Sequence, residues 1–479
     1  MSNNTWKKVV ASLSRLGLYN VPHANQVASE SVHGARLAAE WKGCSVCLEE
    51  NRLCKCGGGG GVGGGVGVAD HEGGHHLNSD SSFAHSVINM VGMLIWLGQL
   101  STPYALETGG WCTSFILIAL GATCAYTAHL LGRCLHRSSK SSKTYQDIGD
   151  QAFGPKGRLI ASTFIYLEIF LALVGYTISL SDNLSVVFSS AHLTSPHWLR
   201  LSTPQLLTLI AVVVALPSLW LRDLSSISFL SFGGILMSVL IFATVCFTAV
   251  FGGVKADKYI PALRLRNVPG ISGLYIFSYT GHIVFPNIYT AMKDPSKFTK
   301  VSIMSFTLVT TLYTALAFTG AKLFGPAVNS QITLSMPRHL VSTKIALWAT
   351  VLTPMTKYAL EFAPFAIQLE HSLPHSMSAR ARTLIRGTIG SLFLLVILFL
   401  ALTVPYFGDV LSLTGSLISV SICLVFPCAF YLKICWAEVS RPAVALNAVI
   451  IGVGIVFTVV GTVSSAAALV RSVQRGHSI

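Results

Sequence analysis

Apolar runs long enough to cross a membrane alternate with short polar segments from residue 83 to residue 470. A helix needs about 20 mainly apolar residues to span the hydrocarbon core. The pattern therefore predicts an all-α polytopic membrane protein with eleven transmembrane helices in one domain at 83–470. The predicted helices cover 84–105, 111–135, 159–187, 204–221, 227–252, 270–291, 301–324, 341–369, 384–404, 411–433 and 443–470.

The first run is interrupted by polar and helix-breaking residues where a spanning helix is normally most uniform. These residues are Gly98, Gln99, Ser101, Thr102 and Pro103. Proline removes a backbone donor and clashes with the preceding turn. A broken helix is tolerated at membrane depth only where the freed backbone groups are buried in protein or face water. The sequence thus predicts a cavity beside this break.

The sixth run contains a second interruption of the same kind. Its polar and breaking residues are Ser278, Thr280, Gly281, His282, Pro286 and Asn287. One break alone is typical of a proline kink. Two broken helices five spans apart instead predict a five-plus-five inverted repeat, with a substrate site where broken helices 1 and 6 meet.

Such a site offers groups of both signs to a ligand. The N-terminus of a half-helix carries free N–H groups and partial positive charge, which suit a carboxylate. Unwound carbonyls suit an ammonium group or a cation. The two together match a zwitterionic amino acid. The candidate substrate-binding residues are Ile95, Trp96, Gly98, Gln99, Ser101, Ser278, Thr280, Gly281 and His282.

Three ionisable residues inside predicted spans are candidates for proton coupling, because such residues are costly in a membrane. They are Glu168, His282 and Lys357. Each has a structural alternative. Glu168 fits a buried hydrogen-bond acceptor, and His282 fits a residue that stabilises freed carbonyls. Lys357 and Glu361 are spaced for a pair on one helix face, which favours a structural role.

Composition and charge agree with a membrane protein. The chain is 52% hydrophobic and 11% charged, with a mean hydropathy of +0.63. Its net charge of +14 lies mainly in short loops, so topology and anionic lipid explain it better than nucleic acid does. With the N-terminus in the cytoplasm, 22 Lys and Arg residues lie on the cytoplasmic side and 8 on the opposite side. This excess predicts a cytoplasmic N-terminus.

Residues 1–82 form a glycine-rich cytoplasmic tail that is predicted to be disordered, and 471–479 form a short C-terminal tail. The stretch Gly57 to Gly67 is almost pure glycine, with valine as its only other residue, which resembles a flexible linker. The alternative is a zinc site in the N-terminal tail, but its second cysteine pair is too close for an ordinary structural site. The residues of that alternative are Cys44, Cys47, Cys54, Cys56, His71, His75 and His76. We favour the disordered tail and expect no metal.

Several long motifs in fixed order resemble the amino acid/auxin permease family, and in particular its vacuolar branch in plants and fungi. The motifs are GQLSTPYALETGGW, Tyr145 to Arg158, Ser278 to Phe298, Ser330 to Arg338 and Thr353 to Leu360. The resemblance implies the leucine-transporter-type fold and proton-coupled movement of amino acids, with sodium as the other coupling ion to consider. It implies the vacuolar membrane, with the plasma membrane as the alternative. The segment Tyr145 to Arg158 fits an amphipathic gate segment or a plain anchoring loop.

Two positions depart from the family pattern. Trp96 stands where relatives commonly have glycine, and Gly175 stands where they often carry a second acid. These departures motivate the alternative that the chain is an amino-acid-binding sensor that no longer transports. An enzyme is not favoured, because the spans hold no HExxH motif and no cluster of His, Asp or Cys at one depth. The absence of a Walker A sequence argues against ATP-driven pumping, and no cofactor is expected.

Overall fold

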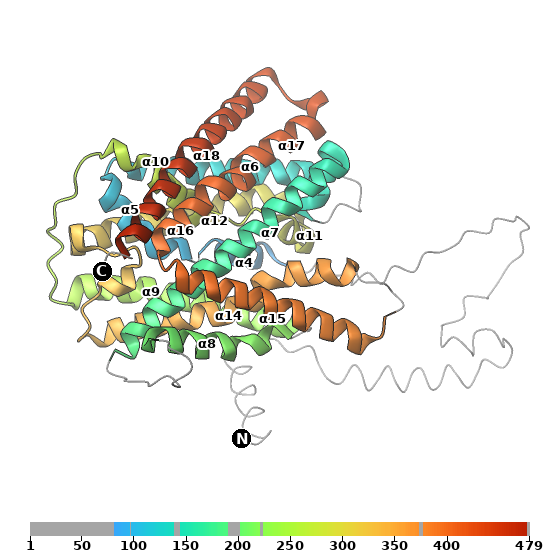
Figure 1. The fold of residues 1–479 in the computed structure, drawn as a ribbon. Coiled ribbons are helices and arrows are strands. Elements are labelled where there is room, and N and C mark those ends of the chain that lie inside the picture. Colours follow the sequence, from blue (N-terminus) through green and yellow to red (C-terminus); the bar gives the residue numbers. More distant parts are fainter. Residues whose placement is uncertain are drawn as a thin grey trace, which may run out of the picture. The chain divides into compact units, whose positions relative to one another are not determined.

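A computed structural model describes residues 81–95, 97–137, 144–189, 202–220, 224–372 and 377–476, without the side chains of 214–232, 356–357, 359–360, 363–372, 379 and 476. The predicted zinc alternative and nearly all of the predicted tail 1–82 lie outside these residues. The α-helices are α4 (Phe83–Leu94), α5 (Leu97–Gly109), α6 (Thr113–Arg137), α7 (Tyr145–Val187), α8 (Thr203–Trp220), α9 (Leu224–Phe251), α10 (Val268–Ser278), α11 (Phe285–Ala291), α12 (Phe298–Phe324), α13 (Ile332–Ser335), α14 (Val341–Ser372), α15 (Ala379–Thr403), α16 (Phe407–Thr414), α17 (Phe426–Ile434) and α18 (Arg441–Gly476) (Figure 1).

Every predicted apolar run coincides with a helix or with a broken pair of helices. Among the described residues, seven helices are long and apolar enough to cross a membrane, and α4 with α5 forms one further bent span. The count of eleven spans therefore stays a prediction. The last helix, α18, continues to Gly476, beyond the predicted end of the domain at residue 470.

The first break lies earlier in the chain than predicted. Helix α4 ends at Leu94, Ile95 is extended, and α5 begins at Leu97 with its axis inclined by 59° to α4. The predicted breaking residues form the first turns of α5 instead. Pro103 cannot donate to the carbonyl of Gln99, but the hydroxyl of Thr102 does so at 3.1 Å. The helix therefore passes through the proline without an unsatisfied carbonyl.

The second break separates α10 from α11 and covers Tyr279–Val284. Here the prediction holds for Thr280, Gly281 and His282, which lie in this unwound segment. Ser278 is the last residue of α10, and the prediction is wrong for Pro286 and Asn287, which lie in the first turn of α11. Proline is well suited to that position, because its missing N–H would have no partner there in any case.

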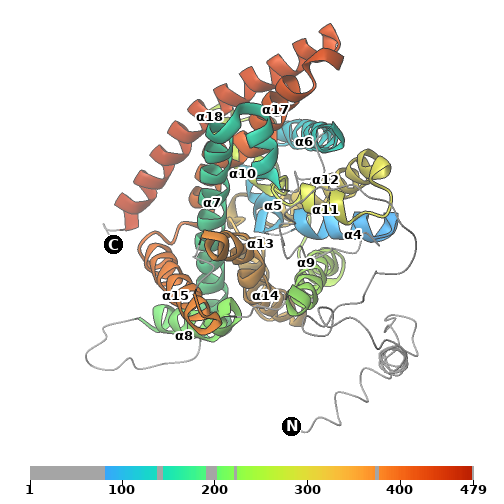
Figure 2. The same cartoon turned by 90° about the vertical axis from the view of Figure 1, so that its right-hand side faces the viewer.

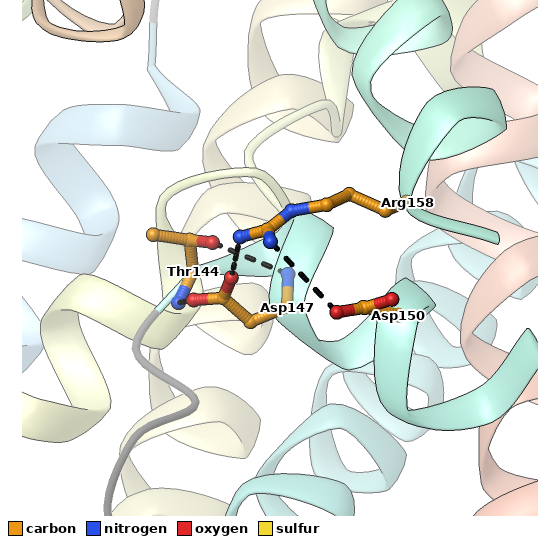
Figure 3. A network of polar contacts seen from close by, with 4 residues as sticks. All are labelled: Thr144, Asp147, Asp150 and Arg158. Carbon is orange, nitrogen blue, oxygen red and sulfur yellow. Dashed lines mark hydrogen bonds and ion pairs between the residues drawn. The ribbon is translucent and has the colours of Figure 1, made fainter. Parts of the chain in front are cut away.

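The segment before the third span is helical, so the plain-loop alternative is wrong. Helix α7 begins at Tyr145 and turns sharply at Gly154, whose φ of 65° favours glycine. Thr144 caps its start in a capping box with Asp147. Arg158 pairs with Asp147 and approaches Asp150 at 3.8 Å (Figure 3). Because Arg158 follows the turn, it holds the short first part of α7 against the long second part.

The two broken helices lie at the centre of the helical domain. Helix α5 packs against α10 and α12, while α14 packs along α9 and α7. The long helix α7 contacts α8 and α15 towards one end and α17 towards the other (Figure 2). Two π-helical turns, Gly415–Ser419 and Ser421–Val425, join α16 to α17. The first packs against α10, and both pack against α18. Single π-helical turns are frequent at functional sites.

Candidate site between the two broken helices

Gly98 of α5 packs directly against Ser278, the last residue of α10. A Cβ atom added to Gly98 would lie 2.4 Å from the Cα atom of Ser278, which is a backbone atom and cannot rotate away. Gly281 approaches the other half of the first span, because a Cβ there would lie 3.1 Å from Leu94 Cδ2. The structure therefore brings the two breaks together, as the inverted-repeat pattern predicts.

One hydroxyl joins the freed carbonyls of both breaks. The Tyr313 hydroxyl of α12 lies 2.6 Å from the carbonyl oxygen of Leu94 and 3.1 Å from that of Ser278. Both carbonyls belong to the last residue of a half-helix, where four acceptors lack intrahelical donors. The Tyr313 side chain is fully buried. The role of Tyr313 cannot be predicted from the sequence, because a tyrosine in an apolar helix carries no distinguishing pattern.

Ser238 of α9 also forms a hydrogen bond to the backbone at the first break. The Ser238 hydroxyl donates to the carbonyl of Ile95 at 3.4 Å, and the Gln99 side-chain amide donates to the carbonyl of Ser238 at 3.5 Å. Gln99 is buried, and its Oε1 atom has no hydrogen-bond partner in the described part of the chain. An unpaired buried acceptor costs free energy. This oxygen is therefore available to a ligand that brings a donor.

Beside Gln99 lies a small cavity of about 10 Å³. Its lining comes from four helices and consists of Leu97, Gln99, Leu100, Ser179, Ser238, Ile241, Thr350, Thr353 and Pro354. That volume holds about one water molecule. The cavity is thus far too small for an amino acid, and the structure is closed around the site.

His282 lies in the unwound segment with its imidazole fully buried. Its Nε2 atom is 3.0 Å from the hydroxyl of Thr127 on α6, whereas Nδ1 has no partner among the described residues. The ring also packs against Phe285 and Phe306, with centroid distances of 4.8 and 6.1 Å. Hydrogen bonding by the described residues therefore holds the imidazole through Nε2 and leaves Nδ1 open to a ligand.

Glu168 lies buried on α7, opposite the π-helical turns. The Ser419 hydroxyl lies 3.0 and 3.2 Å from its two carboxyl oxygens, and no ion pair among the described residues includes Glu168. Four residues after Ser419, the Cys423 thiol lies 3.9 Å from the hydroxyl of Thr280. The π-helical turns therefore touch both the buried carboxyl group and the unwound segment.

A hydrogen-bond network closes the end of the site that faces the α12–α14 connection. Gln331 donates to Asp182 at 2.6 Å and accepts from Ser179 and Asn183 at 2.7 and 2.8 Å. Thr333 donates to Asn183 at 2.9 Å. Ser179 also lines the small cavity beside Gln99. Gln331 therefore lies between that cavity and the outside.

Outside this network lies a polar vestibule of about 550 Å³. Asp182 lines it from α7, Tyr104 from α5 and Asp409 from α16. It is large enough to admit a small polar solute.

Four further residues that the sequence analysis singled out lie away from the contacts described above or outside the described residues. Ser101 is buried, but its hydroxyl donates to the carbonyl of Gly98 within its own helix. Trp96 and the side chain of Lys357 lie outside the described residues, and so does the predicted Lys357–Glu361 pair. Gly175 has a packing reason, because a Cβ there would lie 2.9 Å from Leu411 Cδ1 and 3.4 Å from Leu97 Cδ1. An acid at that position would require neighbouring side chains to move.

A family model described as transmembrane amino acid transporter protein matches residues 79–470. The chain belongs to this transmembrane amino acid transporter family. It is 60% identical to amino acid transporter AVT1H of Arabidopsis thaliana, over 91% of this chain and 99% of that protein. It is 40% identical to AVT1D of the same plant, over 80% and 69% of the two chains. It is also 24% identical to the vesicular GABA transporter of Caenorhabditis elegans, over 82% and 81%.

Among solved structures, the chain is similar to the inward-facing conformation of Mhp1. The TM-score is 0.52 at 12% identity, and the match covers 83% of this chain and 91% of that one. This similarity concerns the fold alone and confirms the predicted leucine-transporter-type architecture with broken helices 1 and 6. The predicted family is confirmed as well, and it is a family of transporters rather than enzymes.

Proposed function

We propose that this chain is a secondary active transporter that moves amino acids across a membrane by alternating access. The observation that carries the proposal is the contact of Gly98 with Ser278, which places the two helix breaks face to face. Breaks at this depth present N–H groups to a carboxylate and carbonyls to an ammonium group. The relatives named as amino acid transporters support this substrate class.

The closed geometry supports alternating access. The cavity beside Gln99 holds about one water molecule, so an amino acid needs α5 to separate from α10. The Gln331 network closes the path from the vestibule. Opening the Gln331 network would expose the site to one side of the membrane. Separating α5 from α10 would expose it to the other side, so the two sides would gain access alternately. The substrate-binding residues in this proposal are Ile95, Gly98, Gln99, Ser278, Thr280, Gly281 and His282.

Proton coupling is proposed to use Glu168. Its described partner is the neutral hydroxyl of Ser419, so a change in its charge alters the contact with the π-helical turns. Those turns reach Thr280 in the unwound segment through Cys423. Protonation and the shape of the substrate site are thereby linked through one short stretch of backbone. The Nδ1 atom of His282, which has no hydrogen-bond partner among the described residues, is a second candidate proton site. Sodium is the alternative coupling ion.

The family resemblance supports the vacuolar membrane as the location, and the distribution of Lys and Arg supports a cytoplasmic N-terminus. The alternative of a sensor that no longer transports has no support among the described residues. Trp96 lies outside them, and Gly175 is explained by close packing.

The test is uptake of labelled amino acids into proteoliposomes that contain the full-length protein. A pH gradient and a sodium gradient are imposed separately, and each amino acid is tested in both. Accumulation with the pH gradient alone supports the proposal. Accumulation only with sodium would overturn proton coupling, and no flux of any amino acid through correctly inserted protein would overturn transport.

A further inference from the structure

A groove of about 900 Å³ runs between α6 and α12 on the surface of the helical domain, outside the candidate site. Ala122 of α6 and both Ile303 and Thr307 of α12 line it with exposed side chains. Along α12 it extends from Thr299 to Ala315, a rise of about 24 Å at 1.5 Å per residue. One leaflet of the hydrocarbon core is ~15 Å thick. The groove is therefore long enough to hold an acyl chain of one leaflet.

The walls of the groove are apolar in spite of their threonines. The hydroxyls of Thr307, Thr311 and Thr314 donate to carbonyls one turn earlier in α12, at 2.7 to 2.8 Å. Hydroxyls that bond to their own helix in this way offer no free donor to the groove. The groove thus presents methyl and aliphatic groups, which favour an acyl chain over a polar solute.

One end of the groove is polar and positively charged. His129 and Thr299 bridge the two helices there, with Nδ1 2.7 Å from Oγ1. Arg133 follows His129 by one helical turn and lies 3.5 Å from Glu438, which Arg137 also contacts. Lys300 follows Thr299 and is exposed. Two arginines share one carboxylate and a lysine lies on the neighbouring helix, so this end carries excess positive charge.

We infer that the groove binds one acyl chain of an anionic glycerophospholipid. The chain lies between α6 and α12, and the phosphate lies at the end marked by His129, Arg133 and Lys300. Anionic lipid attracts basic residues near the membrane surface. In the predicted orientation this end faces the cytoplasm, where α6 ends and α12 begins.

The inner wall of the groove touches the unwound segment. Thr310 lines the groove and accepts a hydrogen bond from the Tyr279 hydroxyl at 3.0 Å. A Cβ at Gly121 would lie 2.3 Å from Thr310 Oγ1 and 2.9 Å from the Tyr279 hydroxyl. Phe306, also in the wall, packs against both Tyr279 and His282. A bound acyl chain supports this wall and thereby the closed position of the unwound segment; this consequence rests on the proposed function.

Lipid binding is tested by native mass spectrometry of the full-length protein, with phosphatidylserine and phosphatidylcholine offered in turn. The double variant Arg133→Gln/Lys300→Gln removes two charges and should retain phosphatidylserine about 30-fold less, at ~1 kcal/mol for each charge. Thr307→Phe fills the groove and should lower retention without a change of charge. Two substitutions on α18, away from the groove, are the matched controls. Arg475→Gln removes a charge near the C-terminal end of this helix, and Val449→Phe adds a phenyl ring at an exposed position.

Selective retention of phosphatidylserine that both groove variants reduce, and both controls preserve, supports the site. Equal retention of the two lipids would overturn the anionic headgroup, and unchanged retention in both groove variants would overturn the groove. Uptake in phosphatidylcholine liposomes, with and without phosphatidylserine, then tests the functional link. Retention without any transport would count against the proposed function alone, whereas transport without selective retention would count against the lipid site alone.

Discussion

The hydroxyl of Tyr313 donates to the carbonyl oxygen of Leu94 across 2.6 Å. The same hydroxyl lies 3.1 Å from the carbonyl of Ser278, so one side chain of α12 contacts the last carbonyls of the half-helices α4 and α10. Leu94 and Ser278 are both buried, so their carbonyls are shielded from bulk solvent. This relationship explains how two interrupted helices remain stable at membrane depth.

Replacing Tyr313 by Phe should destabilise the protein by about 1–3 kcal/mol, because it leaves buried acceptors without their donor. The measurement is the thermal midpoint of the purified protein in detergent, compared with that of the wild type. Tyr259→Phe is the control, because Tyr259 is 79% exposed. Equal midpoints for the two variants would show that the hydroxyl is not needed at the breaks.

Replacing Glu168 by Gln should abolish accumulation driven by a pH gradient while exchange of substrate across the membrane persists. Glutamine preserves the contact with Ser419 but cannot change charge. The two activities are measured in the same proteoliposomes, with Asp257→Asn on an exposed segment as the control. Full gradient-driven accumulation by the Gln variant would remove Glu168 from the coupling mechanism.

Replacing Gln331 by Ala should open the path from the vestibule. It removes the hydrogen bonds to Asp182, Ser179 and Asn183, and a net loss of ~1.4 kcal/mol corresponds to about tenfold more open protein. The readout is the rate at which a cysteine placed at Ser179 reacts with a membrane-impermeant thiol reagent. Ser330→Ala should leave this rate unchanged, and a Gln331→Ala rate equal to it would contradict the proposed closure.

Replacing Thr144 by Ala should loosen the first part of α7. The capping box with Asp147 is lost, which typically costs about 1 kcal/mol. Amide hydrogen exchange over 145–153 should accelerate about fivefold, while exchange in α12 should not change. The matched control is Thr163→Ala, an exposed threonine within α7. Similar exchange in both variants would mean that packing, rather than the cap, orders this segment.

Much of the fold can be predicted from the sequence, because apolar length and helix-breaking residues act locally. The pairing of the breaks follows from their spacing, and the contact of Gly98 with Ser278 agrees with it. The positions of the breaks are less predictable. Pro103 remains inside α5, because the Thr102 hydroxyl satisfies the carbonyl that proline frees. Such compensation depends on a side-chain rotamer that a residue pattern does not contain.

The site residues that could not be predicted all contact residues that are far from them in the sequence. Tyr313, Ser238, Ser419 and Gln331 contact the site from four elements, and none stands out within its own segment. The π-helical turns before α17 are a partial exception, since their serines interrupt an otherwise apolar run. Tertiary packing decides which polar residue forms a hydrogen bond to a freed carbonyl. The local sequence pattern contains no information about that packing.

The most direct test of the central claim compares glycine substitutions in the proton-driven uptake assay. In Gly98→Ala the new methyl group would lie 2.4 Å from the Cα atom of Ser278, whereas at Gly452 a Cβ meets nothing within 4 Å. Overpacking costs about 1–3 kcal/mol, so uptake by Gly98→Ala should fall roughly 5- to 150-fold. Gly452→Ala should match the wild type. Equal uptake by the two variants at equal expression would contradict a substrate site between the broken helices.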